Sequence, residues 1–247
     1  MGHLTASLVA ALLVAAVFPV GGWFSSSTAV EKFWSRRRWI SAAAGISVAY
    51  IFVDVLPELE LQRRALVEAS EIVFFAEQRV YVLALLSFVV FYGIEHIVLV
   101  SREHRQQTAA MGQTSPIYLL QLSGYAAYSA LIGYLLVERA ERGGISLTLY
   151  AFAMAVHFLI VDHSLGEEHE QAYGRRGRRV LAASVILGWV IGASMPLSEA
   201  VVARLFALLA GGVVITSLQA ELPDEREGRF WPFSAGALCF ASLLLLA

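Results

Sequence analysis

The chain has 247 residues, of which 58% are hydrophobic and 15% charged, and its formal net charge at pH 7 is −2. Soluble domains have roughly 45–50% apolar and about 25% charged residues, so this composition excludes a soluble enzyme. The small net charge gives no basic surface for a nucleic acid. The one cysteine, Cys239, excludes an intrachain disulfide and a cysteine-based metal cluster.

The apolar residues are concentrated in eight blocks, each close to the length that crosses a bilayer as a helix. We therefore predict an all-α polytopic membrane protein, with residues 1–247 forming one integral membrane domain. Eight spans leave too few residues for a separate soluble domain. The predicted spans are 4–22, 39–57, 80–100, 116–137, 146–165, 179–196, 199–221 and 230–247.

The charges between the blocks predict how the chain is oriented in the membrane. Only His3 precedes the first block, whereas Lys32 and Arg36 to Arg38 follow it, which is unlike a cleaved signal peptide. Twelve Lys and Arg residues lie in the loops that follow odd-numbered spans, and five lie in the other loops. Because basic residues are retained in the cytoplasm, we expect both termini outside. The expected location is a prokaryotic cytoplasmic membrane, with the lipid bilayer as the main partner.

Spans 2 and 7 share a short pattern. In each, a glycine (Gly45 or Gly211) is followed eleven residues later by Leu-Pro and an acid, ending at Glu58 and Asp224. The two spans would run in opposite directions, which predicts an inverted repeat of spans 1–3 and 6–8 around spans 4 and 5. The alternative is that each glycine packs helices and each proline ends one. If the repeat helices are adjacent, Asp54 of span 2 is placed to pair with Arg204 of span 7.

Ionisable residues inside spans are costly and tend to be functional. Span 5 contains His157, Asp162 and His163, and imidazole with carboxylate suits zinc or a similar divalent ion. These three residues are the candidate metal ligands. The alternative is that His157 only hydrogen-bonds a neighbouring helix. We interpret the acidic run from Glu167 to Glu170 as a solvated helix end.

Spans 2, 3 and 4 supply further candidates for a transport pathway. They are Asp54 in span 2, Glu95 and His96 in span 3, and Tyr128 and Ser129 in span 4.

We expect Tyr128 and His157 to meet in the interior. Tyr128 lies ~18 Å along its span and His157 ~16 Å along the next. Both depths fall near the middle of a hydrocarbon layer that is ~30 Å thick. There the phenol and the imidazole satisfy each other or both contact an ion.

Eight spans with outer termini, the Leu-Pro-acid motif and the histidine of span 5 together resemble the ZIP family of divalent-metal transporters. The family pattern H-[NS]-x-x-[DE]-G corresponds to the stretch from Tyr128 to Gly133, in which Ser129 and Gly133 match. The family pattern H-E-x-P-H-E corresponds to the stretch from His157 to Asp162, in which the two end residues match. The family's histidine near the end of span 2 is Asp54 here.

The resemblance implies a transporter, rather than an enzyme, whose substrate is zinc, iron or manganese and which uses no organic cofactor. Most of the family's ligand positions differ in this chain. One alternative is that the ion site has moved to Asp162, His163, His169 and Glu95. The other is that the fold works without metal, as a scaffold, a sensor or a carrier of another solute. A zinc-dependent lipid hydrolase within the membrane is a third hypothesis. A homodimer remains open.

Overall fold

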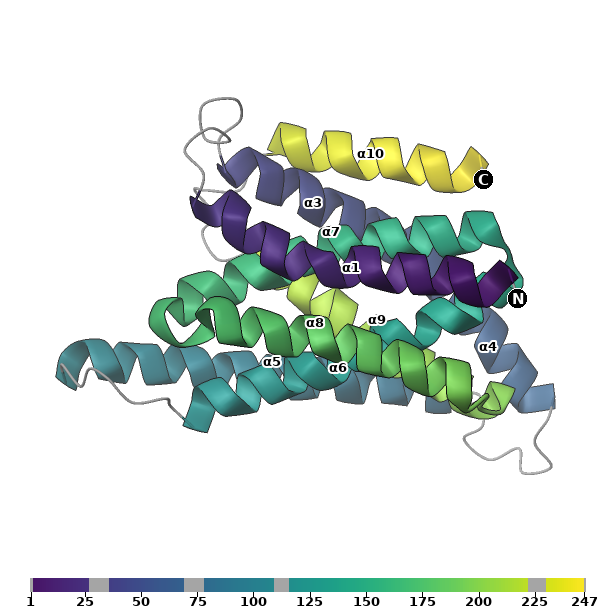
Figure 1. Ribbon diagram of the computed structural model, residues 1–247, viewed down its shortest axis with the longest axis horizontal. Coiled ribbons are helices and arrows are strands. Elements are labelled where there is room, and N and C mark those ends of the chain that lie inside the picture. Colours follow the sequence, from purple (N-terminus) through teal and green to yellow (C-terminus); the bar gives the residue numbers. More distant parts are fainter. Residues whose placement is uncertain (1, 27–35, 69–77, 109–115, 222–229, 247) are drawn as a thin grey trace.

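A computed structural model of the chain describes residues 2–26, 36–68, 78–108, 116–221 and 230–246. These residues form helices packed side by side, and the part of the chain so described contains no strand (Figure 1). The helices are α1 (Gly2–Ser26), α3 (Arg36–Tyr50), the π-helix η1 (Ile51–Val55), α4 (Leu56–Glu68), α5 (Arg79–Thr108), α6 (Pro116–Arg142), α7 (Gly144–Glu168), α8 (Glu170–Ser194), α9 (Glu199–Glu221) and α10 (Phe230–Leu246).

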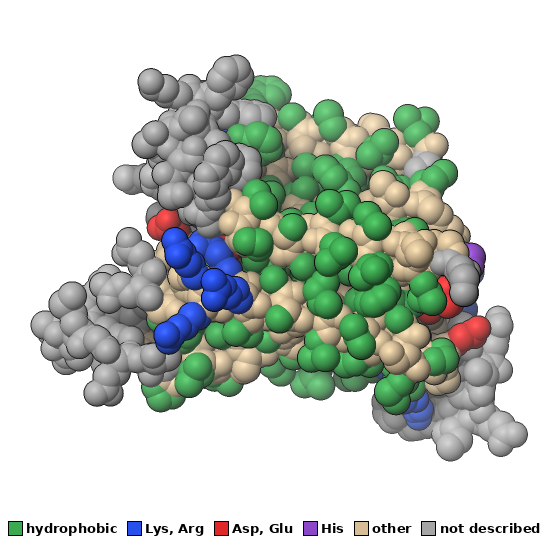
Figure 2. All heavy atoms as spheres, in the orientation of Figure 1, with side chains coloured by type: hydrophobic (Ala, Val, Ile, Leu, Met, Phe, Trp, Pro, Cys, Tyr) green, Lys and Arg blue, Asp and Glu red, His purple; other side chains and the backbone are tan. Residues whose placement is uncertain are grey.

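The lengths and compositions of these helices are those of an integral membrane protein. Within the described ranges, seven helical stretches are long and apolar enough to cross a membrane, and α10 is a shorter apolar helix. Large apolar side chains such as Leu85, Leu187 and Leu238 are exposed, and Figure 2 shows hydrophobic side chains spread over the face in view. In a membrane, this apolar surface faces the hydrocarbon of the lipid. The two ends of the chain lie at the same end of the bundle (Figure 1).

The interior is built from helices that are distant in sequence. The pairs α6 with α8, α3 with α10, and α5 with α9 pack along one another, and α1 packs on both α7 and α8. Helix α9 also contacts α3, η1 and α4, so spans 2 and 7 are adjacent.

Glycines allow three of these helix pairs to bring their backbones into contact. A Cβ atom at Gly45 would lie 2.1 Å from the carbonyl oxygen of Phe233 in α10, and one at Gly211 would lie 1.9 Å from that of Ala84 in α5. At Gly188 the nearest atom is the carbonyl oxygen of Ala130 in α6, at 1.8 Å. Such small residues are typical of close helix pairs in membranes.

Span 2 differs from its prediction at the Leu-Pro motif. The motif does not end the helix, because α4 continues from Leu56 through Pro57 to Glu68. The turn before it is the π-helix η1, which contains Asp54. A proline removes one backbone donor, and a π turn accommodates that gap within a continuous helix. The matching motif at residues 222–224 lies outside the described residues.

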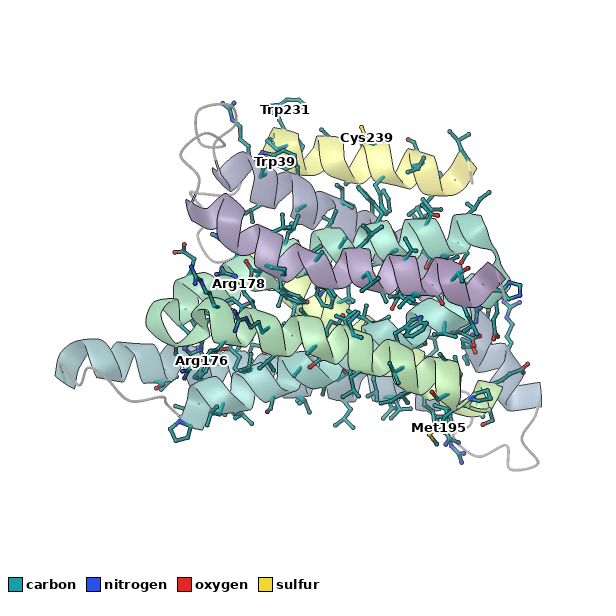
Figure 3. All side chains as sticks on the ribbon, in the orientation of Figure 1. Trp39, Arg176, Arg178, Met195, Trp231 and Cys239 are labelled. Carbon is teal, nitrogen blue, oxygen red and sulfur yellow. The ribbon has the colours of Figure 1, made fainter. Side chains whose placement is uncertain are left out.

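One end of the bundle is strongly basic. Arg175, Arg176 and Arg179 are exposed at the start of α8. Figure 2 shows a cluster of Lys and Arg side chains at one end of the face in view, and Figure 3 shows Arg176 and Arg178 at the opposite end of α8 from Met195. We use the term basic end for this side of the molecule, where α7 ends and α8 begins.

Candidate functional site

Tyr128 of α6 and His157 of α7 meet in the interior, as predicted. Their ring centroids are 5.8 Å apart in an edge-on arrangement, and the residues are 4% and 0% exposed. They do not satisfy each other, however, because neither the Tyr128 hydroxyl nor His157 Nδ1 has a hydrogen-bond partner. The other imidazole nitrogen, Nε2, lies 3.4 Å from Thr216 Oγ1 of α9. The first of the two expected outcomes is therefore not observed, because an edge-on ring contact brings the rings together without aligning their polar atoms. Contact of both groups with an ion stays a prediction.

Neighbouring helices shape the space around the Tyr128 ring. A Cβ atom at Gly212 of α9 would lie 2.6 Å from Tyr128 Cε2, so the ring occupies space that only a glycine leaves. Phe91 of α5 packs edge-on against the same ring, with centroids 5.4 Å apart. Thr216 donates from Oγ1 to the carbonyl of Gly212 at 2.8 Å, which holds its hydroxyl beside His157.

Further hydroxyl groups without partners lie on the same central helices. Ser129 follows Tyr128 on α6, Ser217 follows Thr216 on α9, and the Oγ atoms of both serines are buried and unpaired. The Oγ atom of Ser47 in α3 is also unpaired. Nearly all buried polar groups in proteins are hydrogen-bonded, and an unmade bond costs about 1–3 kcal/mol. The unpaired groups of Tyr128 and His157, whose rings are in contact, therefore indicate a place for water or a ligand. The central polar group is here defined as Tyr128, Ser129, His157, Thr216 and Ser217.

Asp162, a predicted metal ligand, is engaged elsewhere. It is 3% exposed and accepts hydrogen bonds from Arg178 Nε at 2.7 Å and from Tyr173 at 2.7 Å. Arg178 Nη2 is 3.2 Å from the second oxygen, and the guanidinium stacks 5.1 Å above the Tyr173 ring. Asp162 therefore joins α7 to α8 near the basic end, apart from the contacts of His157. His163, the third predicted ligand, is partly buried.

Asp54 pairs with Arg139 of α6 at 3.0 Å, and the predicted partner Arg204 is instead exposed. Arg139 is buried, and its guanidinium lies between the rings of Tyr150 and Phe206, 5.5 Å and 5.3 Å from their centroids. Sequence reasoning placed Asp54 against the repeat helix and overlooked Arg139, which it treated as a loop charge. Through these contacts with Asp54, Tyr150 and Phe206, the Arg139 guanidinium connects α6 to η1, α7 and α9.

Glu95 belongs to a second polar network, nearer the basic end. Its Oε1 accepts hydrogen bonds from Gln121 Nε2 at 3.0 Å and from the Tyr125 hydroxyl at 2.9 Å. Gln121 also contacts Glu168 and His169. His96 is exposed and stacks on Tyr92, so the two neighbours in sequence face different surroundings.

Gln121 and Tyr125 were not among the predicted residues. Their spacing with Tyr128, at i, i+4 and i+7, places all three on one face of α6 and was the signal that could have found them.

The predicted metal ligands do not form one cluster. Among the residues that the structure describes, no group of three or more His, Cys, Asp or Glu side chains is arranged to hold a metal ion. The moved site, made of Asp162, His163, His169 and Glu95, is therefore not brought together.

No known family model, curated protein or solved structure matches this chain. The interpretation of the central polar group therefore depends on its own geometry.

Proposed function

We propose that this protein is a membrane transporter with a ZIP-like arrangement, in which a small polar solute passes between α3, α6, α7 and α9. The central polar group carries the proposal, because Tyr128 and Thr216, on two further helices, both contact His157 in the interior. The Tyr128 hydroxyl, His157 Nδ1 and the Ser129 and Ser217 hydroxyls are buried without partners. In a closed apolar core such groups are costly because they lack hydrogen-bond partners, whereas a solute or its hydration water would supply those partners. Zinc, iron or manganese is the substrate that the resemblance implies.

The pattern of helix pairs supports an inverted repeat of eight spans, with α10 as the eighth. In such a repeat, α5 corresponds to α10, α3 to α9 and α6 to α7. The contact between α5 and α9 then corresponds to the contact between α10 and α3, and both are present. The same correspondence, with α1 and α8 as counterparts, relates the contact between α1 and α7 to that between α8 and α6. Gly45 and Gly211, which the shared motif aligns, both lie at these matched contacts. Transporters with inverted repeats bind substrate near the midplane between the two halves.

The charged residues support the proposed orientation. The basic end carries the four arginines of the loop between spans 5 and 6, which the positive-inside rule assigns to the cytoplasm. On that assignment both termini are outside, at the opposite end of the bundle.

One observation favours a second candidate, a carrier of an uncharged polar solute. The central polar group offers one imidazole and several hydroxyls, whereas zinc sites in proteins are formed by about four His, Cys or carboxylate ligands. The acids Asp54 and Asp162 are paired with arginines. A dehydrated divalent cation beside His157 would then have neither of these two carboxylates free to offset its charge, and the Glu95 carboxylate already accepts hydrogen bonds from Gln121 and Tyr125. The hydrolase hypothesis gains no comparable support from the described contacts.

Uptake into proteoliposomes tests both candidates. Purified protein would be assayed for zinc, iron and manganese entry and, by light scattering after an osmotic shift, for glycerol and urea entry. We expect one of these solutes to enter faster than in empty vesicles. His157→Ala should abolish that difference, whereas the matched control His96→Ala, on an exposed face of α5, should retain it. Folded wild-type protein that moves none of these solutes would overturn the proposal.

A further inference from the structure

The polar network around Glu95 has a feature that the proposed transport path does not use. Glu95 is 5% exposed in the apolar helix α5, and both hydrogen bonds to its carboxylate come from neutral groups, the Gln121 amide and the Tyr125 phenol. The other two carboxylates described above, the partly buried Asp54 and the buried Asp162, each have an arginine. No Lys or Arg ion pair with Glu95 is found among the described side chains. An unpaired buried charge is costly, so a buried acid without a cation is favoured in its neutral form, and ionisable residues at membrane depth often belong to proton relays.

Gln121 connects Glu95 to the end of α7. Its Nε2 donates to Glu95 Oε1 and also to Glu168 Oε2, so one amide group holds two carboxylates from different helices. Its Oε1 faces His169 Nε2, which fixes that nitrogen as the donor in this contact. Glu168 and His169 are only partly buried, at the basic end. The carboxamide thus lies between a buried acid and two groups within reach of water.

The network also leads inward to the central polar group. Gln121, Tyr125 and Tyr128 lie on one buried face of α6. Phe91 packs edge-on against both tyrosines, with centroids 5.6 Å and 5.4 Å away, so the three rings form one aromatic cluster. At the inner end of this face, the Tyr128 hydroxyl and His157 Nδ1 are buried and unpaired. Beyond them the same face of α6 continues as Ile132, which is fully buried and apolar. The polar side chains Gln121, Tyr125 and Tyr128 therefore extend along α6 from the basic end to the centre of the bundle, where Ile132 follows.

We propose that Glu95 is a proton-binding site, which exchanges its proton with the water at the basic end by way of Glu168, His169 and Gln121. This inference goes beyond the proposed function and does not depend on what is transported. The step is the uptake of one proton by the Glu95 carboxylate to give the neutral acid, with Glu168 or His169 as the group that first takes the proton from water. Gln121 neither gains nor loses a proton; its carboxamide rotates away so that the donor meets Glu95.

Each helix that packs against α5 carries its own titratable groups. Helix α6 contributes Tyr125, and α7 contributes Glu168 and His169 across Gln121. Helix α4 contacts α5 near its other end, where Tyr81 donates to Glu60. Helix α9 also packs on α5, and its described charges, Glu199 and Arg204, lie in its first two turns. None of these supplies a cation in a described contact with Glu95.

Infrared difference spectroscopy of the full-length protein in lipid nanodiscs tests the site directly. We expect a protonated-carboxyl band that appears as pH is lowered and shifts in heavy water. Glu95→Gln should remove this band and keep the acceptor oxygen for Tyr125, whereas the exposed control Glu199→Gln should retain it. A band that persists in Glu95→Gln, or that is lost in Glu168→Gln alone, would overturn the proposal.

Two further variants keep the test decisive if Glu95→Gln does not fold. Tyr125→Phe should shift the frequency of the band, because it removes a hydrogen bond to the titrating carboxyl; an unchanged frequency would overturn the assignment. Gln121→Leu should slow the response of the band to a pH jump at least tenfold, and an unchanged rate would overturn the proposed route. None of these readouts requires transport, so a failure of the uptake assay leaves them unaffected.

Discussion

The contact between Asp162 and Arg178 gives the sharpest prediction about stability. The carboxylate is almost fully buried and receives two bonds from one guanidinium and a third from Tyr173. Arg178→Ala would leave a buried charge without its partner, and breaking such a pair costs about 3–5 kcal/mol. Tyr173→Phe removes one bond to a charged group, for which we expect about 1.5–3 kcal/mol.

The assay is equilibrium unfolding in mixed micelles, followed by circular dichroism, with Arg176→Ala as the matched control. Arg176 is exposed on the same turn of α8, so its loss should change stability by less than about 0.5 kcal/mol. The double variant Asp162→Asn with Arg178→Ala should be more stable than Arg178→Ala alone, because it removes the unpaired charge. If Arg178→Ala is as stable as Arg176→Ala, the pair is solvated and the reasoning about burial is refuted.

Two further predictions concern helix contacts in the membrane core. Gly45→Ala and Gly211→Ala should each lower stability by about 1–3 kcal/mol, because the new Cβ would overlap a backbone carbonyl of the partner helix. Gly93→Ala, where a Cβ meets no atom within 4 Å, should be neutral or slightly stabilising, and equal losses at all three sites in a thermal unfolding assay would contradict the packing. Arg139→Ala should cost about 1.5–3 kcal/mol, because it removes a hydrogen bond to the partly exposed Asp54 carboxylate. Asp54→Asn in that background should recover part of the loss, and no recovery would indicate that the two residues are not coupled.

The sequence predicted the parts of this molecule that follow from hydropathy and depth. Long apolar runs must form helices in lipid because every backbone group needs an internal partner, so the helical architecture could be predicted. The meeting of Tyr128 and His157 followed from counting residues along two neighbouring spans.

Side-chain partners could not be predicted, because they depend on which helices are adjacent and how each is rotated. The shared motif predicted that spans 2 and 7 are adjacent and therefore that Asp54 pairs with Arg204. The two spans are adjacent, but the Asp54 side chain pairs with Arg139 of α6. Asp162 was predicted as a metal ligand because the sequence shows no basic partner close to it. Arg178 is sixteen residues away, and only the packing of α8 on α7 brings the two side chains together. The π turn at Asp54 likewise has no simple sequence signature apart from the following Pro57.

If water and solute reach the central polar group, cysteines substituted there will react with water-soluble reagents. Ser129→Cys and Ser217→Cys, in a Cys239→Ser background, change one atom each at buried unpaired positions. We predict that a membrane-impermeant thiosulfonate modifies both and that transported solute slows the reaction, whereas Leu85→Cys on the exposed apolar surface stays unmodified. If neither central cysteine reacts from either side of the membrane, while Glu199→Cys at a helix end does, the centre of the bundle is closed and the account is contradicted.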